Sequence, residues 1–426
     1  MRARLVAWAF FDWADAGYST MIQTFVFAAY FTGRVAPSST EGTSLWGGAI
    51  AAAGFVVALG GPVAGAIADE GGRRKPWLLG FTTLTVVATA GLWLVRPDPS
   101  DAGLALVLVG LASVGSALAG VFYNALLPVL AESDRIGRWS GIGWGLGYVG
   151  GVACLVVAWA AFLGEDTWID LDPARGLPVR ATCLLAAGWV AIFAVPLLSL
   201  RIDTPDAGLP IRQAVPSGLQ RLSRTLRDIT RHAGIARFLL ARLLYADGLA
   251  TLFAFGGVYA AGTFGMSEAE VLQFGIALSL SAAAGAWIFS GIDDRLGGKR
   301  SAALALTALL LGGIVTVLAG SRAVFWGAAL FVGAFVGPVQ SASRSYMARM
   351  APDALRNEMF GLYALAGKVT SFLGPALVAS VTALAQSQRV GMAVVLVFFA
   401  LGLLVLLSVP SDAPGRRQSV EGCAPR

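Results

Sequence analysis

Apolar stretches of about 20 residues recur along the whole chain, separated by short segments that hold most of its charges. A stretch of that length crosses the hydrocarbon core of a bilayer as an α-helix. Helices are favoured because lipid offers no partner for a free backbone N–H or C=O group. With 57% hydrophobic and only 13% charged residues, the chain lies outside the composition of soluble globular domains. The sequence therefore predicts an all-α polytopic membrane protein.

Twelve membrane spans are predicted, and one long hydrophilic segment separates the sixth from the seventh. The spans cover residues 5–33, 44–68, 76–95, 103–128, 139–163, 180–201, 236–262, 268–292, 300–320, 323–347, 358–384 and 388–410. The 53 glycines suit this class because small residues let spanning helices approach closely. Three cysteines without paired spacing indicate neither a disulfide framework nor a metal cluster. No secretory signal is expected, so the first helix should be retained.

The hydrophilic segment divides the chain into two halves. We expect an N-terminal six-helix bundle at 1–202, a cytoplasmic amphipathic linker at 203–235, a C-terminal six-helix bundle at 236–410 and a disordered cytoplasmic tail at 411–426. In the linker, Leu219, Leu222 and Leu226 repeat at helical spacing while several arginines face elsewhere, which is typical of a basic helix on a membrane surface. A solvated helix that joins the halves is favoured over a specific lipid-binding role. His232, the sole histidine, is interpreted as a solvated linker residue.

The distribution of basic residues predicts the orientation. With the N-terminus inside, 22 of the 31 Lys and Arg residues fall in inner loops and tails, six fall in outer loops, and three lie within spans. Because inner loops of membrane proteins carry the excess of Lys and Arg, both termini are expected in the cytoplasm. The net charge of +6 is thus an orientation signal and not a mark of nucleic-acid binding. The expected location is the plasma membrane, which in a bacterium is the inner membrane.

The two halves repeat each other. The stretch "GAIADEGGRRK" after the second span recurs as "SGIDDRLGGKR" after the eighth. "WADAG" aligns with "YADG" and pairs Asp15 with Asp247, while a second alignment pairs Tyr148 with Lys368. Since six spans separate the copies, both halves have the same orientation. Parallel six-helix repeats around a central axis are the architecture of one large class of transporters.

These stretches carry a resemblance. "GAIADEGGRRK" resembles the loop motif of the major facilitator superfamily, although Glu70 stands where the family has a basic residue. The motif residues are Gly65, Asp69, Gly72, Arg73 and Arg74, with Asp294, Arg295, Gly297, Lys299 and Arg300 in the second copy. "FFDWADAGYST", "RLLYADG", "QSASRSYMARM" and "FGLYALAGKVTSFLGP" resemble the vacuolar amino-acid effluxer branch, related to the yeast autophagy permease. That branch usually has Asn where this chain has Asp15. The resemblance implies a secondary transporter fold, and more weakly an amino-acid-like substrate.

Ionisable groups inside spans are candidates for the transport chemistry. Asp15, Asp247 and Lys368 lie near the middle of the first, seventh and eleventh spans, and we expect them to share one polar site. The alternative is a structural ion pair that locks the two halves together. Asp12, Asp15, Ser19 and Gln23 are spaced three, four and four apart, which predicts one polar stripe on the first helix.

Further polar and aromatic groups lie at similar depths. Asp12, Arg242, Arg344 and Glu358 are expected to form an inner gate closed by salt bridges, unless their charges reach the interface instead. The remaining substrate candidates are Trp144, Tyr148, Tyr245, Tyr363, Asn124 and Gln340; for any single aromatic ring, helix packing is the favoured role. Asp69 and Asp294 are expected to meet the N-termini of helices near Glu358 and Trp139, and so to couple conformations.

The leading hypothesis is alternating access by two bundles that carry a small polar, plausibly amino-acid-like solute, coupled to protons. Lys368 would attract a carboxylate, and Asp15 or Asp247 would accept an ammonium group or a proton, since burial favours the neutral acid. Sodium coupling, facilitated transport and exchange stay open. The alternatives are efflux of a lipophilic or cationic compound, or a transport-dead sensor or assembly factor. No metal-ligand cluster, catalytic dyad or phosphate-binding loop indicates an enzyme, and no cofactor is expected. The expected state is a monomer in the lipid bilayer.

Overall fold

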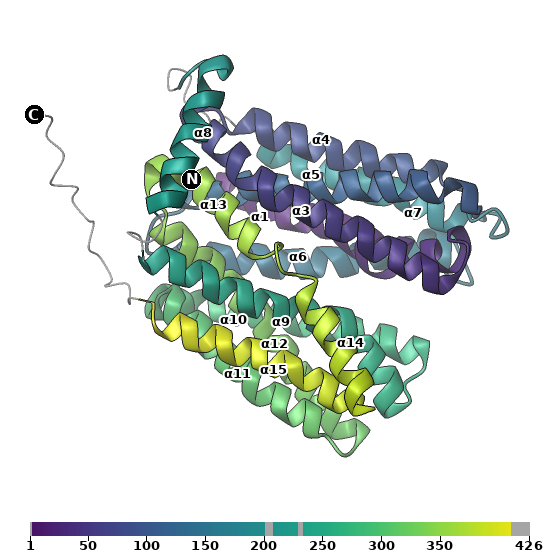
Figure 1. Ribbon diagram of the computed structural model, residues 1–426. Coiled ribbons are helices and arrows are strands. Elements are labelled where there is room, and N and C mark those ends of the chain that lie inside the picture. Colours follow the sequence, from purple (N-terminus) through teal and green to yellow (C-terminus); the bar gives the residue numbers. More distant parts are fainter. Residues whose placement is uncertain (1, 201–207, 229–232, 410–426) are drawn as a thin grey trace, which may run out of the picture.

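The computed structural model describes residues 2–200, 208–228 and 233–409, and these residues form helices joined by short loops (Figure 1). The helices are α1 (Arg2–Tyr18), α2 (Phe27–Tyr30), α3 (Ser39–Gly71), α4 (Lys75–Gly91), α5 (Ala102–Leu130), α6 (Ile136–Ala158), α7 (Leu177–Ser199), α8 (Ile211–Asp228), α9 (Ala233–Phe264), α10 (Glu268–Leu296), α11 (Gly298–Leu318), α12 (Arg322–Met350), α13 (Arg356–Ala366), α14 (Leu373–Ala385) and α15 (Gln388–Leu407). His232 and the expected tail lie outside the described residues.

Ten helices of the described part of the chain are long and apolar enough to cross a membrane. The first and eleventh predicted spans are not among them. After α1 the chain continues as a π-helix over Ser19–Phe25, and residues 367–372 form turns between α13 and α14. The eleventh predicted span is therefore broken into two helices, whereas the first stays helical from Arg2 to Phe25. In the eleventh, Pro375 has no N–H for the carbonyl of Ser371, which favours the break.

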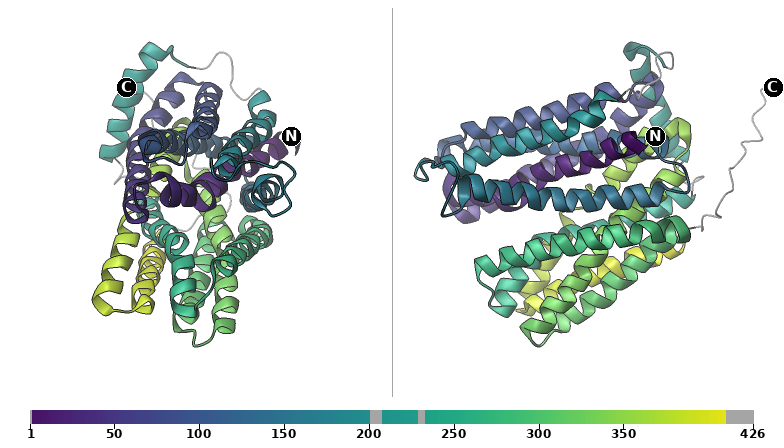
Figure 2. Two further views of the ribbon diagram at one scale, coloured as in Figure 1. Left: turned by 90° about the vertical axis from the view of Figure 1, so that its right-hand side faces the viewer. Right: turned by 180° about the vertical axis from the view of Figure 1, so that it is seen from behind.

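The helices form two groups, which Figures 1 and 2 show side by side. In the first group α4 packs on α5, and α1 packs on α6 and α7; in the second α11 packs on α12 and α9 on α15. The groups meet where α6 packs on α10 and α3 on α13. We call the end of the molecule at which α8 and the N-terminus lie the linker end, and the opposite end the far end (Figure 1).

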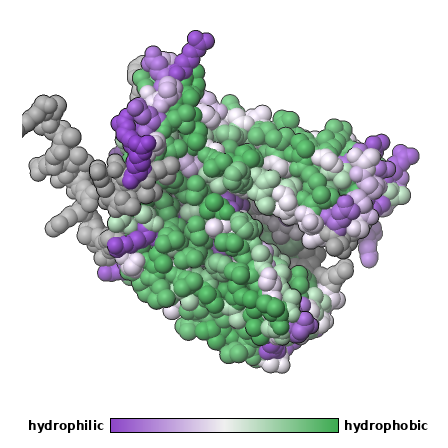
Figure 3. Space-filling model, in the orientation of Figure 1, coloured by the Kyte–Doolittle hydropathy of each residue, from purple (hydrophilic) through white to green (hydrophobic). Residues whose placement is uncertain are grey.

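The two groups are in contact at the linker end and separated on one side toward the far end. α13 packs against α3 and α5 of the first group, whereas α14 packs against α9 and α15 of its own group. The other side stays joined by α6 and α10. Figure 3 shows the surface hollowed between the two groups toward the far end. We call this space the central hollow.

Glycines allow the close approach of α3 and α13. A Cβ atom built on Gly361 would lie 2.5 Å from the Gly61 carbonyl oxygen, and one on Gly65 would lie 2.4 Å from the Asn357 carbonyl oxygen. Both contacts are with backbone atoms, which cannot rotate away. The linker end therefore closes only because these positions lack side chains.

The substitution Gly361→Ala is expected to push α13 away from α3. Because the added methyl group meets backbone on the facing helix, the variant should lose about 1–3 kcal/mol of stability. Thermal unfolding in detergent measures this loss. Gly80→Ala is the matched control, since a Cβ atom on Gly80 meets nothing within 4 Å. An unfolding midpoint for Gly361→Ala equal to that of the control would contradict the close packing described here.

Candidate functional site

Asp15 and Lys368 form a pair of opposite charges between the two groups of helices. Asp15 of α1 is half-buried and accepts a 2.7 Å hydrogen bond from Ser116 Oγ of α5. Lys368 lies in the break of the eleventh span, is exposed, and acts electrostatically on Asp15. No ion pair within 4.0 Å joins the two. The two charges therefore act on each other without a direct ion pair, and Arg242 acts on Lys368 as well.

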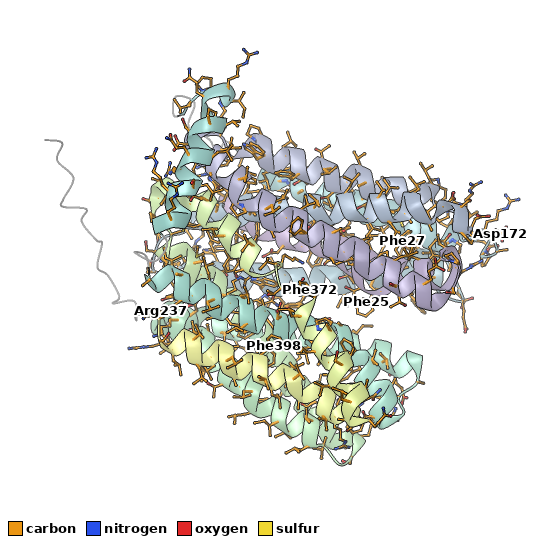
Figure 4. The ribbon with its side chains drawn as sticks, viewed as in Figure 1. Phe25, Phe27, Asp172, Arg237, Phe372 and Phe398 are labelled. Carbon is orange, nitrogen blue, oxygen red and sulfur yellow. The ribbon has the colours of Figure 1, made fainter. Side chains whose placement is uncertain are left out.

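Aromatic side chains lie beyond this pair. Phe372 follows Lys368 in the break and is 58% exposed, and Phe25 closes the π-helical segment after α1. Figure 4 shows both rings at the boundary between the two groups of helices. The Phe25 ring lies 3.4 Å from the position of a Cβ atom on Gly275 of α10. One aromatic ring from each half thus lies at the boundary between the two groups.

Asp247 lies outside this pair, although the sequence predicted one site for all three groups. It is on α9 and 1% exposed. Within the described part of the chain, Thr370 is the side chain that acts on its carboxyl group, as a hydrogen-bond donor. Neither Asp15 nor Lys368 acts on it electrostatically. The structure brings two of the three predicted residues together and leaves Asp247 with a separate environment.

Arg344 of α12 is the most heavily bonded of the predicted gate residues. Although its side chain is charged and lies in a membrane-spanning helix, it is only 2% exposed. Its Nη1 atom bonds to Asp12 Oδ2 at 2.8 Å and to Asn124 Oδ1 at 3.3 Å. Its Nε atom donates to Ser140 Oγ at 2.9 Å, and Nη2 donates to the Ser140 carbonyl oxygen at 2.6 Å. All of these partners belong to the first group of helices.

Aromatic rings of the first group complete the environment of the Arg344 guanidinium. Its carbon atom lies 4.8 Å from the centre of the Trp8 ring, 5.5 Å from Trp144 and 5.6 Å from Tyr123. Such contacts stabilise a cation that has left water. One side chain of the second group is thus held by charge, hydrogen bonds and aromatic rings of the first.

The other two gate residues do not join Asp12 and Arg344, so the expected gate of four charges is divided. Arg242 lies over the Tyr363 ring at 3.4 Å from its centre and donates to the Tyr363 carbonyl oxygen. Glu358 is buried at the linker end, where its backbone N–H donates to Asp69. Only the pair Asp12–Arg344 has the predicted form.

Several predicted substrate residues make structural contacts instead of facing the charged pair. Tyr245 is buried and bonds to Ser343, and Gln23 donates to Tyr18 and Ser113 inside the first group. Ser19 donates to the Ala16 carbonyl oxygen. The predicted polar stripe assumed α-helical spacing, which the π-helix from Ser19 onward does not keep.

Two of the predicted substrate residues bond to each other across the two groups. Gln340 Nε2 of α12 donates a 2.8 Å hydrogen bond to Tyr148 Oη of α6, and both side chains are half-buried. It joins α6 to α12, as the Ser140–Arg344 contact does. Trp144 lies one helical turn before Tyr148, with ring centres 6.0 Å apart.

The loop aspartates meet helix N-termini of the opposite group. Asp69 at the end of α3 accepts hydrogen bonds from the backbone N–H groups of Asn357 and Glu358, where α13 begins. Asp294 at the end of α10 accepts one from the backbone N–H of Arg138, where α6 begins. The positive end of each helix favours a carboxylate there. These are the contacts that the repeated motif predicted for the two loops.

Two glycines of the motif form turns, and most of its basic residues lie at or near the surface. Gly72 has φ 64° and ends α3, and Gly297 has φ 83° between α10 and α11, so each turn uses a backbone conformation that glycine favours. Arg74 lies 4.0 Å from Asp69, and Lys299 donates to the Leu407 carbonyl oxygen at 3.1 Å. Exposed side chains occupy the other three basic positions, which are Arg73, Arg295 and Arg300.

α8 is fastened to both groups at the linker end. Its face toward α3 is made by Ala214, Gly218 and Leu222, while Leu219 is exposed. Arg221 binds Glu70 of α3 at 2.6 Å and lies 3.9 Å from Glu358 of α13. Its Nη2 atom also donates to a carbonyl oxygen just before α13. Arg221 is one of the linker arginines expected on the face away from the leucines, and in the structure it bridges the two groups.

The substitution Glu70→Arg, which restores the basic residue usual in this motif, is expected to loosen α8. It places two positive charges side by side where an ion pair now stands, with an expected loss of about 1 kcal/mol or less because the site is partly exposed. Faster trypsin cleavage within α8 would report the change. The double variant Glu70→Arg/Arg221→Glu should restore resistance, and Glu132→Arg, at an exposed acid of the same end, is the control. Equal cleavage of all variants would contradict the bridge.

Residues that the sequence analysis missed supply much of this geometry. Trp8 and Tyr123 stack on each other with ring centres 4.6 Å apart beside Arg344. Asp293, next to the predicted Asp294, is 2% exposed and binds Arg349 at 3.1 Å. Ser116 and Ser140 give no signal in the sequence, since small hydroxyl residues are common in apolar helices. The first acid of "DD", Asp293, and the last arginine of "RSYMAR", Arg349, could have been paired as charges within one half.

Comparisons with known proteins agree with this geometry. Residues 40–419 match the family model described as "Vacuole effluxer Atg22 like". An uncharacterized MFS-type transporter of Bacillus subtilis, YxiO, is 27% identical over 416 residues, which cover 95% of this chain and 94% of the relative. Autophagy-related protein 22 of Cryptococcus neoformans is 26% identical over 306 residues, 67% of this chain and 54% of the relative.

Solved structures show the same fold. The proton:xylose symporter XylE, a major facilitator superfamily (MFS) protein, superposes with a TM-score of 0.75 at 14% identity, covering 96% of this chain and 95% of that one. The MFS transporter FucP in the outward conformation gives 0.73 at 13% identity, covering 97% and 99%. The predicted twelve-span fold of two parallel six-helix repeats is thereby confirmed.

Proposed function

Since this chain belongs to the vacuole effluxer Atg22-like family of the major facilitator superfamily, we propose that it carries a small zwitterionic, amino-acid-like solute by alternating access. Membership makes it a multi-pass membrane transporter. The nature of the solute rests on the pair Asp15 and Lys368, which interact without a direct ion pair. A solute with an ammonium and a carboxylate group would satisfy both charges at once.

Proton coupling follows from the same pair. With Asp15 ionised, Lys368 is attracted to it. When Asp15 takes up a proton, Lys368 is left to bind the carboxylate of the solute, and the neutral carboxyl group of Asp15 still accepts a hydrogen bond from the ammonium group. Asp15 is the candidate of the two predicted acids, because Lys368 acts on it and does not act on Asp247. Its hydrogen bond from Ser116 holds the carboxyl group in place.

Alternation would take place between the two groups of helices. The described structure is closed at the linker end by Arg344, by the loop aspartates and by Arg221, and is open toward the far end. We place the linker end in the cytoplasm, as the positive-inside rule suggests, so that this state faces outward. The transporter would act as a monomer in the plasma membrane with both termini inside.

A thermal-shift screen of the purified protein tests the substrate class. Amino acids, peptides, sugars and organic cations are compared at two pH values. Selective stabilisation by zwitterionic amino acids is expected, because only they satisfy both charges, and it should depend on pH. A solute at 100 times its dissociation constant would stabilise the folded state by about 2.7 kcal/mol. Stabilisation by hydrophobic organic cations alone would contradict the proposal and favour an efflux pump for such compounds.

A further inference from the structure

Asp247 is a buried carboxyl group to which the described part of the chain brings no counter-charge. Its side chain is 1% exposed, and its Oδ2 atom accepts no hydrogen bond from the described residues. Thr370 acts on the carboxyl group, but no described lysine or arginine does. An unpaired carboxylate out of water is strongly unfavourable. The group therefore requires either a proton or a bound cation.

The chain beside Asp247 offers further oxygen atoms. Gly374, at the start of α14, lies against it: a Cβ atom built there would be 3.0 Å from the Asp247 carbonyl oxygen. The preceding residues 367–372 break the eleventh span. In that break the Ser371 carbonyl group lacks its helical donor, because the residue four positions later is Pro375, which has no backbone N–H. The Thr370 hydroxyl group is buried beside the Asp247 carboxyl group, close enough to act on it as a hydrogen-bond donor.

We propose that Asp247, Thr370 and the carbonyl group of Ser371 form a binding site for one sodium ion. Sodium is bound by oxygen ligands of this kind, and unwound backbone in a broken membrane helix is where such ligands become available. A single carboxylate balances one positive charge, and the described residues hold no group of three acidic, His or Cys side chains that would suit a divalent metal.

The site is separate from the charged pair of the proposed function. Asp247 acts on neither Asp15 nor Lys368. It lies where α9 meets α14, so a bound ion would hold the outer half of the eleventh span against its own group. The proposal of a sodium site therefore does not rest on the identity of the transported solute.

Sodium binding to the purified full-length protein tests the proposal. The unfolding midpoint and binding of radioactive ²²Na⁺ are measured in NaCl against choline chloride at equal ionic strength and fixed pH. We expect saturable, sodium-specific stabilisation that Asp247→Asn abolishes. Thr370→Val should weaken sodium binding roughly ten-fold while leaving the protein folded. Asp15→Asn should keep the sodium response, which separates this site from the solute site.

Two results would overturn the sodium site. One is equal behaviour in sodium and choline, and the other is a sodium response that persists in Asp247→Asn. A midpoint that depends on pH equally in both salts, and loses that dependence in Asp247→Asn, would identify Asp247 as a proton site instead. If Asp247→Asn does not fold, Thr370→Val decides the question through its weakened ²²Na⁺ binding.

Discussion

Replacing Arg344 by alanine is expected to open the linker end and abolish transport. The substitution leaves Asp12 without its cation and removes two contacts with Ser140. Breaking a buried pair from one side is strongly destabilising, on the order of 3 kcal/mol. Because every hydrogen-bond partner of the Arg344 side chain described here lies in the first group, this energy is lost only from the state that is closed at the linker end. The equilibrium between the two access states should therefore shift.

Cysteine labelling measures that shift. Ala342, 1% exposed on α12, is replaced by cysteine in a Cys423→Ser background. Labelling should be slow with Arg344 present and fast in Arg344→Ala. Arg344→Lys should lie between them, since lysine keeps the charge but loses the planar set of donors. Arg212→Ala, at an exposed arginine of α8, is the control. Slow labelling in Arg344→Ala would show that Arg344 does not hold the linker end shut.

The second large effect is expected from Asp15→Asn. Asparagine has the size of aspartic acid and keeps an oxygen for the Ser116 hydrogen bond, but it neither carries charge nor releases a proton. Loss of one charge-assisted contact is worth about 1.5–3 kcal/mol, or roughly a ten- to hundred-fold change in binding. Proton-driven uptake should fall by that factor, and solute exchange without a proton gradient should persist.

Proteoliposomes with an imposed pH gradient provide the measurement, with the solute that the thermal-shift screen identifies. Asp166→Asn, at an exposed loop acid, controls for the general effect of losing a negative charge. Undiminished proton-driven uptake by Asp15→Asn would remove Asp15 from the coupling mechanism. If Asp247→Asn is undiminished as well, proton coupling through the membrane acids is excluded altogether.

The membrane fold could be predicted from the sequence because span length and apolar content are local properties. The family was also readable, since the motifs around Asp69 and Asp294 repeat in order, and the match over residues 40–419 confirms it. The helix-terminus contacts of these acids followed from one rule of electrostatics applied to loop ends. The sequence placed Asp12 and Arg344 in one set of four gate charges because all four lie at a similar depth, without showing which of them pair.

Other features depend on how helices from distant parts of the chain meet. The π-helix after Tyr18 shifted Ser19 and Gln23 away from the predicted stripe. The break at 367–372 exposed Lys368 while Asp247, at a similar predicted depth, became buried. Spacing along one helix cannot reveal such a difference, because the exposure of a side chain depends on which neighbours pack over it.

What the sequence by itself determined is the set of spans, their repeat in two halves and the charges that they carry, since these depend on hydrophobic length and on local pattern. Only the tertiary structure decided how those charges are divided: Asp12 with Arg344, Asp15 with Lys368, and Asp247 beside Thr370. The physical reason is that a charge in a membrane protein takes the partner that the packing of the helices brings within reach, and this packing depends on long-range contacts such as that between Gly61 and Gly361.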